Sequence, residues 1–112
     1  MNDLAHKTCK PCEGGVDPLD REASEKMLTE LAGNWSLSED ATAISATFRF
    51  PEFYRTMAFI NAVAWVANQQ DHHPDIRFGY NYAEITFTTH AIGGLSENDF
   101  ICAARVDALM AG

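Results

Sequence analysis

The pattern of apolar and polar positions along the chain predicts three helices and four strands. The first helix is expected to begin at Asp17, because Asp is a favoured N-cap residue. Pro18 then suits the first helical position, and Asp20 completes an acidic first turn. Apolar residues at helical spacing continue the helix, and Gly33 is expected to end it.

Alternating apolar and polar residues predict the strands. A short strand opens at Trp35, and residues 42–50 then alternate as a half-buried antiparallel strand does. Residues 76–82 and 83–90 predict two more strands around a turn. The inward faces of the 42–50 and 83–90 strands are expected to carry Ile44, Ala46, Phe48, Phe50, Ala83, Ile85, Phe87 and Thr89.

Two longer helices follow from apolar residues at three- and four-residue spacing. The first of these helices is expected over about residues 52–69, and its apolar stripe is expected to contain Phe53, Met57, Ile60, Ala64 and Ala67. Ser96 and Asp99 resemble a capping box at the start of the other, which runs to about Met110. Its expected buried residues are Ile101, Ala104, Val106 and Leu109. The order α-β-β-α-β-β-α predicts an α+β fold, with a four-stranded antiparallel sheet and helices packed on one face.

Length and charge narrow the class of protein. The 112 residues fit one folded domain over 17–112, and the polar residues 1–16 are expected to form a flexible tail. The net charge of −8 and the lack of a basic cluster argue against nucleic acid or an anionic membrane as partner. No apolar run reaches the roughly 18 residues of a membrane span, and no secretory signal is present. We therefore expect a cytoplasmic protein.

The three cysteines do not form a disulfide framework, because their number is odd. Cys9 and Cys12 form a C-x-x-C motif in the tail, and Cys102 lies far away in the sequence. Such a motif can be half of a zinc site or a redox pair, but the chain has no second copy of it. His6 adds a third possible ligand. We expect a loosely ordered tail, with metal binding by the motif as the alternative.

Three histidines are candidates for chemistry. His72 and His73 follow the end of the long helix, and His90 ends a strand that can return to the same place. Three imidazoles with unperturbed pKa values near 6.5 would then share a pocket. The spacing leaves three interpretations open: a metal-free acid–base site, an exposed loop, or a metal site completed by Asp71 or Asp75.

The residues around these histidines resemble the signature of the pterin-4a-carbinolamine dehydratases. The resemblance begins with the stretch Asp-His-His-Pro-Asp at 71–75. Five residues separate Pro74 from the aromatic Tyr80. Nine then separate Tyr80 from His90, and eight separate His90 from Asp99. This combination is much more specific than a pair of adjacent histidines, and similar segments extend the resemblance over about residues 18–110.

The resemblance implies an enzyme that removes water from 4a-hydroxytetrahydropterin (4a-hydroxytetrahydrobiopterin) and gives quinonoid dihydropterin, with no metal and no organic cofactor. It also implies that an aromatic amino-acid hydroxylase supplies the substrate and that a dihydropteridine reductase recycles the product. A homodimer or homotetramer is implied as well. One position departs from the family: Asn68 stands four residues before His72, where a charged residue, often Glu, is usual.

Carbinolamine dehydration fits a histidine site. A proton must reach the departing hydroxyl and the N5 proton must leave, and imidazole suits both transfers near neutral pH. We assign proton transfer to His72 and His90, and the holding and orienting of the pterin ring to His73. The other expected substrate contacts are Asp71, Thr88, Thr89 and the backbone of Ala91. The expected supporting residues are Asn68, Pro74 and Asp99, the last chiefly as the cap of the third helix.

Two other classes of protein are compatible with the same residues. The first is a non-catalytic module that binds a pterin, which Asn68 favours because an amide cannot take up a proton. The second is a metal-dependent hydrolase or lyase built on the histidines.

Overall fold

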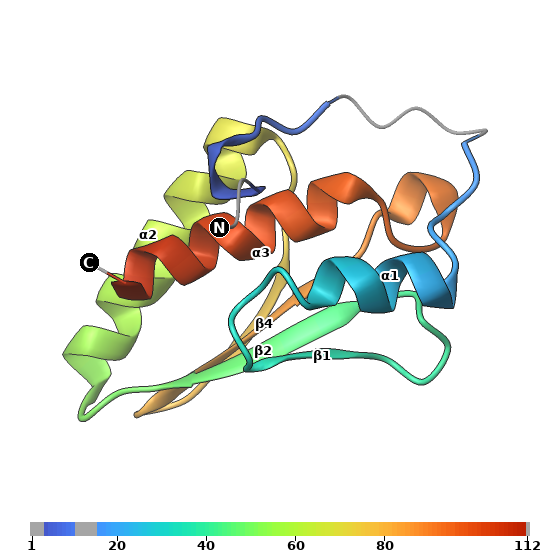
Figure 1. Ribbon diagram of the computed structural model, residues 1–112. Coiled ribbons are helices and arrows are strands. Elements are labelled where there is room, and N and C mark those ends of the chain that lie inside the picture. The colour runs from blue at the N-terminus through green and yellow to red at the C-terminus, as the bar shows by residue number, and fades with distance from the viewer. Residues whose placement is uncertain (1–3, 11–15, 112) are drawn as a thin grey trace.

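The computed structural model describes residues 4–10 and 16–111, which form an antiparallel sheet with helices on one face (Figure 1). The strands are β1 Trp35–Leu37, β2 Ile44–Arg49, β3 Asp75–Phe78 and β4 Tyr82–Phe87, in the sheet order β1-β2-β4-β3. The helices are α1 Arg21–Leu28, α2 Phe53–Gln70 and α3 Glu97–Ala111, with short 3-10 helices η1 Leu4–His6 and η2 His90–Ile92. The predicted α+β class and element order are confirmed.

The inward face of the sheet agrees with the predicted alternation. All of the predicted inward residues of β2 and β4 are buried, as is Thr89, while Phe50 is half-buried at the rim. The ring of Trp35 packs against those of Phe48 and Phe87, with centroids 6.1 Å away in both cases. Aromatic burial of this kind is a major stabilising contribution in a domain of this size.

The predicted start of α1 is wrong. Asp20, not Asp17, is the N-cap, and its carboxylate accepts the backbone N–H of Ala23 at 2.8 Å. The backbone N–H of Leu19 donates to the carbonyl of Leu95, which holds the chain ahead of Asp20 against the lead-in to α3. Because this tertiary hydrogen bond holds Leu19, the helix begins after Asp20 and does not include Pro18.

The predicted stripes of α2 and α3 are correct only in part. The buried side of α2 carries Thr56, Phe59, Ile60, Val63, Val66 and Ala67. Phe53 and Ala64 are exposed, because α2 is apolar around much of its circumference and packing on α3 and β4 selects the side. In α3, Leu109 is 38% exposed near the end of the helix, whereas the other three residues predicted to be buried are so.

The N-terminal residues 4–10 pack along α3, which the sequence pattern did not predict. Leu4 is 2% exposed, and the guanidinium of Arg105 donates two hydrogen bonds to the carbonyl of Lys7. Cys12 of the C-x-x-C motif lies outside the described residues.

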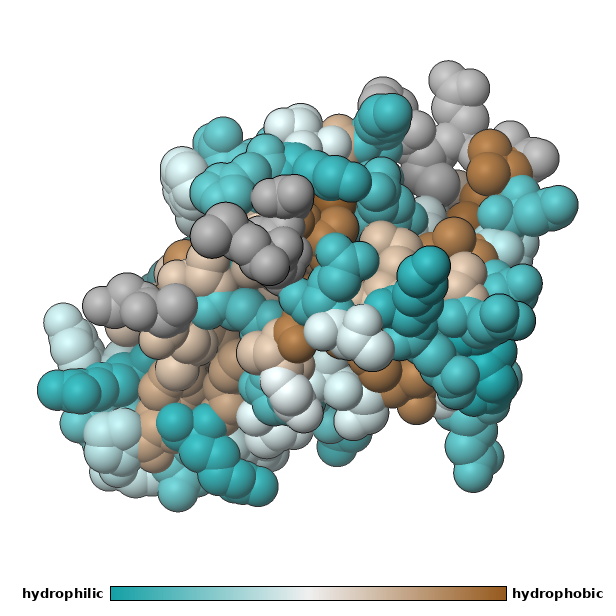
Figure 2. Space-filling model, in the orientation of Figure 1, coloured by the Kyte–Doolittle hydropathy of each residue, from teal (hydrophilic) through white to brown (hydrophobic). Residues whose placement is uncertain are grey.

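The face seen in Figure 2 combines hydrophilic residues with apolar areas between them. Within the described residues, no helix combines the length and apolarity that a membrane span requires.

Candidate active site

The end of α2 positions the two adjacent histidines. Asp71 takes a left-handed backbone conformation, with φ 51° and ψ 43°, and thereby ends the helix. The N–H of His72 donates back to the carbonyl of Ala67 and that of Asp71 to the carbonyl of Asn68, the pattern of a Schellman motif. The chain reverses there, so the two imidazoles go to different partners. Nε2 of His73 lies 3.1 Å from Oδ1 of Asn68, on the exposed side of α2.

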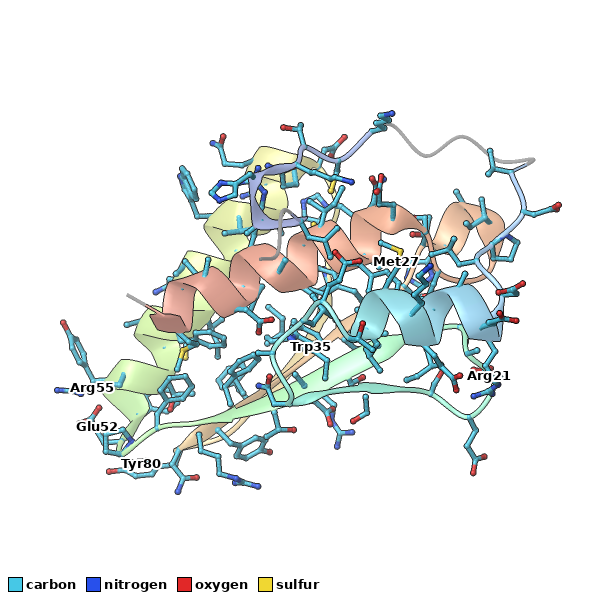
Figure 3. All side chains as sticks on the ribbon, in the orientation of Figure 1. Arg21, Met27, Trp35, Glu52, Arg55 and Tyr80 are labelled. Atoms are coloured by element: carbon cyan, nitrogen blue, oxygen red, sulfur yellow. The ribbon has the colours of Figure 1, made fainter. Side chains whose placement is uncertain are left out.

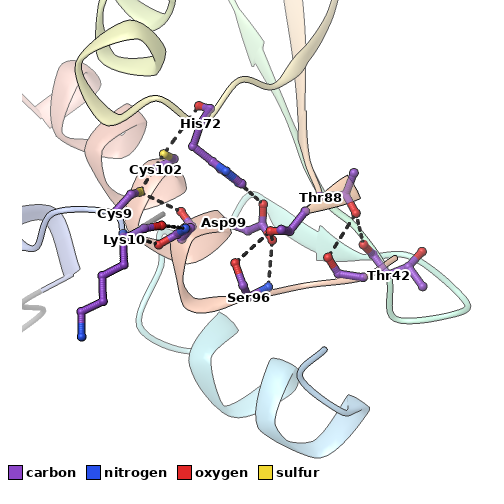
Figure 4. A network of polar contacts seen from close by, with 11 residues as sticks. Cys9, Lys10, Thr42, His72, Thr88, Ser96, Asp99 and Cys102 are labelled. Carbon is purple, nitrogen blue, oxygen red and sulfur yellow. Dashed lines mark hydrogen bonds and ion pairs between the residues drawn. The ribbon is translucent and has the colours of Figure 1, made fainter. Parts of the chain in front are cut away.

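His72 is bound to a fully buried carboxylate. Its Nε2 lies 2.6 Å from Oδ1 of Asp99, whose side chain is 0% exposed (Figure 4). The other oxygen, Oδ2, accepts the hydroxyl of Thr89 at 2.7 Å and the backbone N–H of Ser96 at 2.9 Å. Both oxygens of Asp99 are therefore engaged, as burial of a charge requires. The bond to Ser96 is the predicted helix cap, and the bond to His72 is an addition that the cap did not predict.

The Asp99 carboxylate favours the protonated form of His72. Burial of the ring, of which 11% is exposed, acts against a charge. The hydrogen bond and the negative charge of Asp99 outweigh that effect and raise the pKa of His72 above its ordinary value. The ring also lies nearly parallel to that of Phe87, at 6.2 Å between centroids. The sequence analysis singled out both His72 and Asp99 but did not predict their contact.

The turn that carries His90 is fixed at both ends. Thr89 and Gly94 exchange backbone hydrogen bonds across it, and Gly93 closes η2 with a φ of 68° that glycine adopts without strain. His90 itself is exposed. Since Thr89 donates to Asp99, the same carboxylate joins the turn of His90 to His72.

The predicted substrate-binding hydroxyls make bonds inside the protein. Thr88 donates to the carbonyl of Thr42 at 2.6 Å (Figure 4). Thr89, 3% exposed, donates to Asp99. Ala91 is exposed beside His90. Direct contact of Thr88, Thr89 and Ala91 with substrate stays a prediction.

A cleft of about 440 Å³ opens beside His72 and Asp71. Its walls come from the end of α2, the start of α3 and the N-terminal segment: Thr8, Cys9, Lys10, Gln69, Gln70, Asp71, His72 and Asn98. This volume lies in the range of small-molecule pockets. Sequence reasoning missed the N-terminal wall, because a short polar segment has no periodicity that reveals packing.

The other residues singled out in the sequence are Pro74, Asn68 and Tyr80. Pro74 is half-buried between His73 and β3, and Asn68 holds His73 as described. Tyr80 is 65% exposed, and its carbonyl accepts the hydroxyl of Thr56 in α2. Among the described residues, no group of three or more His, Cys, Asp or Glu side chains is arranged to hold a metal ion.

Comparisons with a family model and with individual proteins agree on one family. Residues 17–109 match the family model described as "Pterin 4 alpha carbinolamine dehydratase". A protein of Nitrosomonas eutropha is 59% identical over 108 residues, which are 96% of this chain and 94% of that protein. One of Legionella pneumophila is 48% identical over 109 residues, covering 97% and 96%. The names of both assign them provisionally as pterin-4-alpha-carbinolamine dehydratases.

Two solved structures share the fold. A transcriptional coactivator/pterin dehydratase from Brucella melitensis has a TM-score of 0.78 and 28% identity, and covers 83% of this chain and 98% of its own. A pterin dehydratase-like protein, identified as a RuBisCO assembly factor in the alpha-carboxysome, has a TM-score of 0.60 and 30% identity. It covers 70% of this chain and 90% of its own.

Proposed function

This chain belongs to the pterin 4 alpha carbinolamine dehydratase family, and from that premise we propose that it removes water from 4a-hydroxytetrahydropterin to give quinonoid dihydropterin. The observation that carries the proposal is His72 held by the buried Asp99 beside an open cleft. An aromatic amino-acid hydroxylase would supply this substrate, and a dihydropteridine reductase would consume the product.

The proposed chemistry needs an acid and a base. The N5 lone pair of the substrate forms a C=N bond as the C4a hydroxyl takes up a proton and leaves as water, and the N5 proton is then removed. His72 suits the acid, because Asp99 favours its imidazolium and, with Nε2 occupied, leaves Nδ1 for a ligand. His90 would take the N5 proton, and His73 would orient the ring.

A direct assay tests the proposal. A hydroxylase generates 4a-hydroxytetrahydropterin, and its decay is followed by absorbance with and without this protein. Because carbinolamines also collapse spontaneously, the uncatalysed rate is measured in parallel and subtracted. We expect acceleration at substoichiometric protein that EDTA does not reduce. No acceleration at stoichiometric protein would reject the proposal, and loss of activity with EDTA would favour the metal-dependent alternative.

A non-catalytic role is the second candidate. Asn68 places a neutral amide, which cannot exchange a proton, against His73, and a solved relative is described as an assembly factor. This role predicts binding of an oxidised pterin, measured by calorimetry, without acceleration of dehydration. The two candidates therefore differ in one assay on the same preparation.

Self-association is part of the proposal. Large aromatic side chains are exposed along α2 and the edge strand β3: Phe53, Tyr54, Trp65 and Phe78. Tyr80 adds to them at the end of the molecule where α2 begins (Figure 3). Exposed apolar residues and an open sheet edge both favour pairing with a second copy. Light scattering coupled to size exclusion distinguishes a homodimer or homotetramer from a monomer.

A further inference from the structure

Two cysteines that are far apart in sequence meet beside the cleft. Sγ of Cys9 lies 3.5 Å from Sγ of Cys102, although 93 positions separate the residues (Figure 4). Cys102 is 0% exposed within α3, and Cys9 is half-buried in the cleft wall. A disulfide requires about 2.05 Å between sulfurs, so the two sulfurs must still approach one another before they can bond.

The chain around Cys9 is held in place by specific bonds. Asn98 clamps the next residue, accepting the N–H of Lys10 at 3.0 Å and donating to its carbonyl at 2.6 Å. The N–H of Cys9 donates to Oε1 of Gln70 at 2.8 Å. These bonds come from both walls of the cleft, so the meeting of the two sulfurs does not depend on a chance position of a loose tail.

The two thiols differ in the way that a reactive and a resolving cysteine differ. The hydrogen bond with Cys102 lowers the pKa of Cys9, against the opposing effect of burial. The same contact and burial raise the pKa of Cys102, which therefore stays a thiol beside the Cys9 sulfur. Cys9 faces the cleft, where a small oxidant can reach it, whereas Cys102 is covered.

We propose that Cys9 and Cys102 form a reversible redox pair, which a hydroperoxide closes into a disulfide that ties the N-terminal segment to α3 beside His72. The proposal is independent of the dehydratase activity.

The oxidation balances in two steps. The Cys9 thiolate attacks hydrogen peroxide, which gives a sulfenic acid and, with one proton, releases water. The Cys102 sulfur then displaces hydroxide from the Cys9 sulfur, and the thiol proton leaves with that hydroxide as a second water. In sum, two thiols lose two electrons and peroxide gains them. A dithiol reductant restores the open pair by exchange.

Closure would act on the cleft through Cys9. The segment Thr8–Lys10 forms one wall, and the Cys102 thiol also contacts the carbonyl of His72, at 3.9 Å. The crosslink would therefore hold this wall against the helix end that carries His72. In the open form, the segment is held by hydrogen bonds to Asn98, Gln70 and Arg105, by the ion pair of Lys7 with Glu97 and by the packing around Leu4.

The test uses the full chain, reduced, desalted and treated with hydrogen peroxide. Because Cys9 and Cys12 fall in the same tryptic peptide, mapping is done on the Cys12→Ser variant as well as on the original chain. We expect a loss of two hydrogens per chain, a peptide that links Cys9 to Cys102, and reversal by dithiothreitol. Oxidation should also slow limited tryptic cleavage after Lys7, because the segment is then tied at Cys9.

Matched variants separate the proposal from its rivals. Cys9→Ser should abolish the crosslink, and Cys102→Ala should leave a sulfenic acid at Cys9 that dimedone captures. Circular dichroism checks that Cys102→Ala folds, and if it does not, the loss of the crosslink in Cys9→Ser carries the test. A Cys9–Cys12 disulfide in the original chain, a crosslink between chains, or oxidation of Cys9 to sulfinic acid without a crosslink in Cys12→Ser would overturn the proposal.

Discussion

His72 and the other two histidines predicted for the site, His73 and His90, occupy opposite environments. His72 is largely covered and bound to Asp99, a carboxylate with no exposure and three bonded partners. His73 and His90 are exposed, and the bonded partner of His73 is the neutral amide of Asn68. A covered imidazole with a fixed carboxylate has a defined orientation and a raised pKa. An exposed imidazole can be replaced by a small molecule from solvent, so the two kinds of histidine should respond differently to mutation.

The largest effect is expected for His72→Ala. Loss of a positioned proton donor should lower kcat by about 10²–10⁴-fold. The measurement is the decay of 4a-hydroxytetrahydropterin, corrected for its uncatalysed rate. His6→Ala removes an exposed histidine from η1 and should leave kcat unchanged. A loss for His72→Ala no larger than that for His6→Ala would remove His72 from the mechanism.

The next effect is expected for His90→Ala. Its kcat should fall by about 10²-fold, the lower end for acid–base help. Because His90 is exposed, added imidazole should restore part of the rate, whereas the covered site of His72→Ala should show little rescue. Titration of imidazole into both variants measures this difference. Equal rescue would contradict the contrast between the two environments.

A smaller effect is expected for Asp99→Asn. The amide oxygen can still accept from Thr89 and Ser96, but the NH₂ group then faces His72 and disfavours its imidazolium. We expect the pKa of His72 to fall and kcat at neutral pH to drop about tenfold, within the range of acid–base effects. Because the proposed mechanism uses His72 as the acid, the alkaline limb of the pH–rate profile should move to lower pH.

Stability provides an independent readout of the same variant. A raised pKa of His72 in the folded state stabilises the fold fully below the unfolded value, near 6.5, and this contribution is lost as the pH rises through the folded value. The pH-dependent part of the Tm difference between the original chain and Asp99→Asn should therefore be largest below pH 6.5 and shrink above it. Asp17→Asn, at an exposed position, should show no such trend.

The smallest effect is expected for Asn68→Asp. The new carboxylate would pair with His73 on an exposed surface, where ion pairs contribute little, so kcat/KM should change by less than about threefold. Any shift of the pH profile should shrink at high salt. Asn61→Asp, elsewhere on the exposed side of α2, is the matched control. A large, salt-insensitive change would indicate that the amide has a role of its own.

Local patterns predicted those features that neighbouring residues determine. The alternation of apolar and polar residues predicted the buried face of β4. Successive side chains of a strand point to opposite faces of the sheet, whichever strand lies beside it. The Ser96–Asp99 spacing gave the start of α3, because the cap bond lies within one turn. The spacing of the histidines indicated their family but not their environments, which depend on what covers each ring.

Features set by tertiary contacts could not be predicted from the sequence. The packing of Leu4 and Lys7 on α3 comes from single contacts in a segment without periodicity. The bond of Asp99 to His72 joins the start of one helix to the end of another, so neither local pattern contains it. Apolar residues lie on most sides of α2, so its sequence does not show which side is buried. Packing on α3 and β4 determines that side.

The turn at Asp71 makes the length of α2 more important than its surface composition. One residue inserted between Ala67 and Asp71 would rotate everything beyond it by about 100° around the helix axis. His72 would then no longer face Asp99. During evolution, such insertions should be rejected here far more strictly than substitutions on the outer side of the same helix.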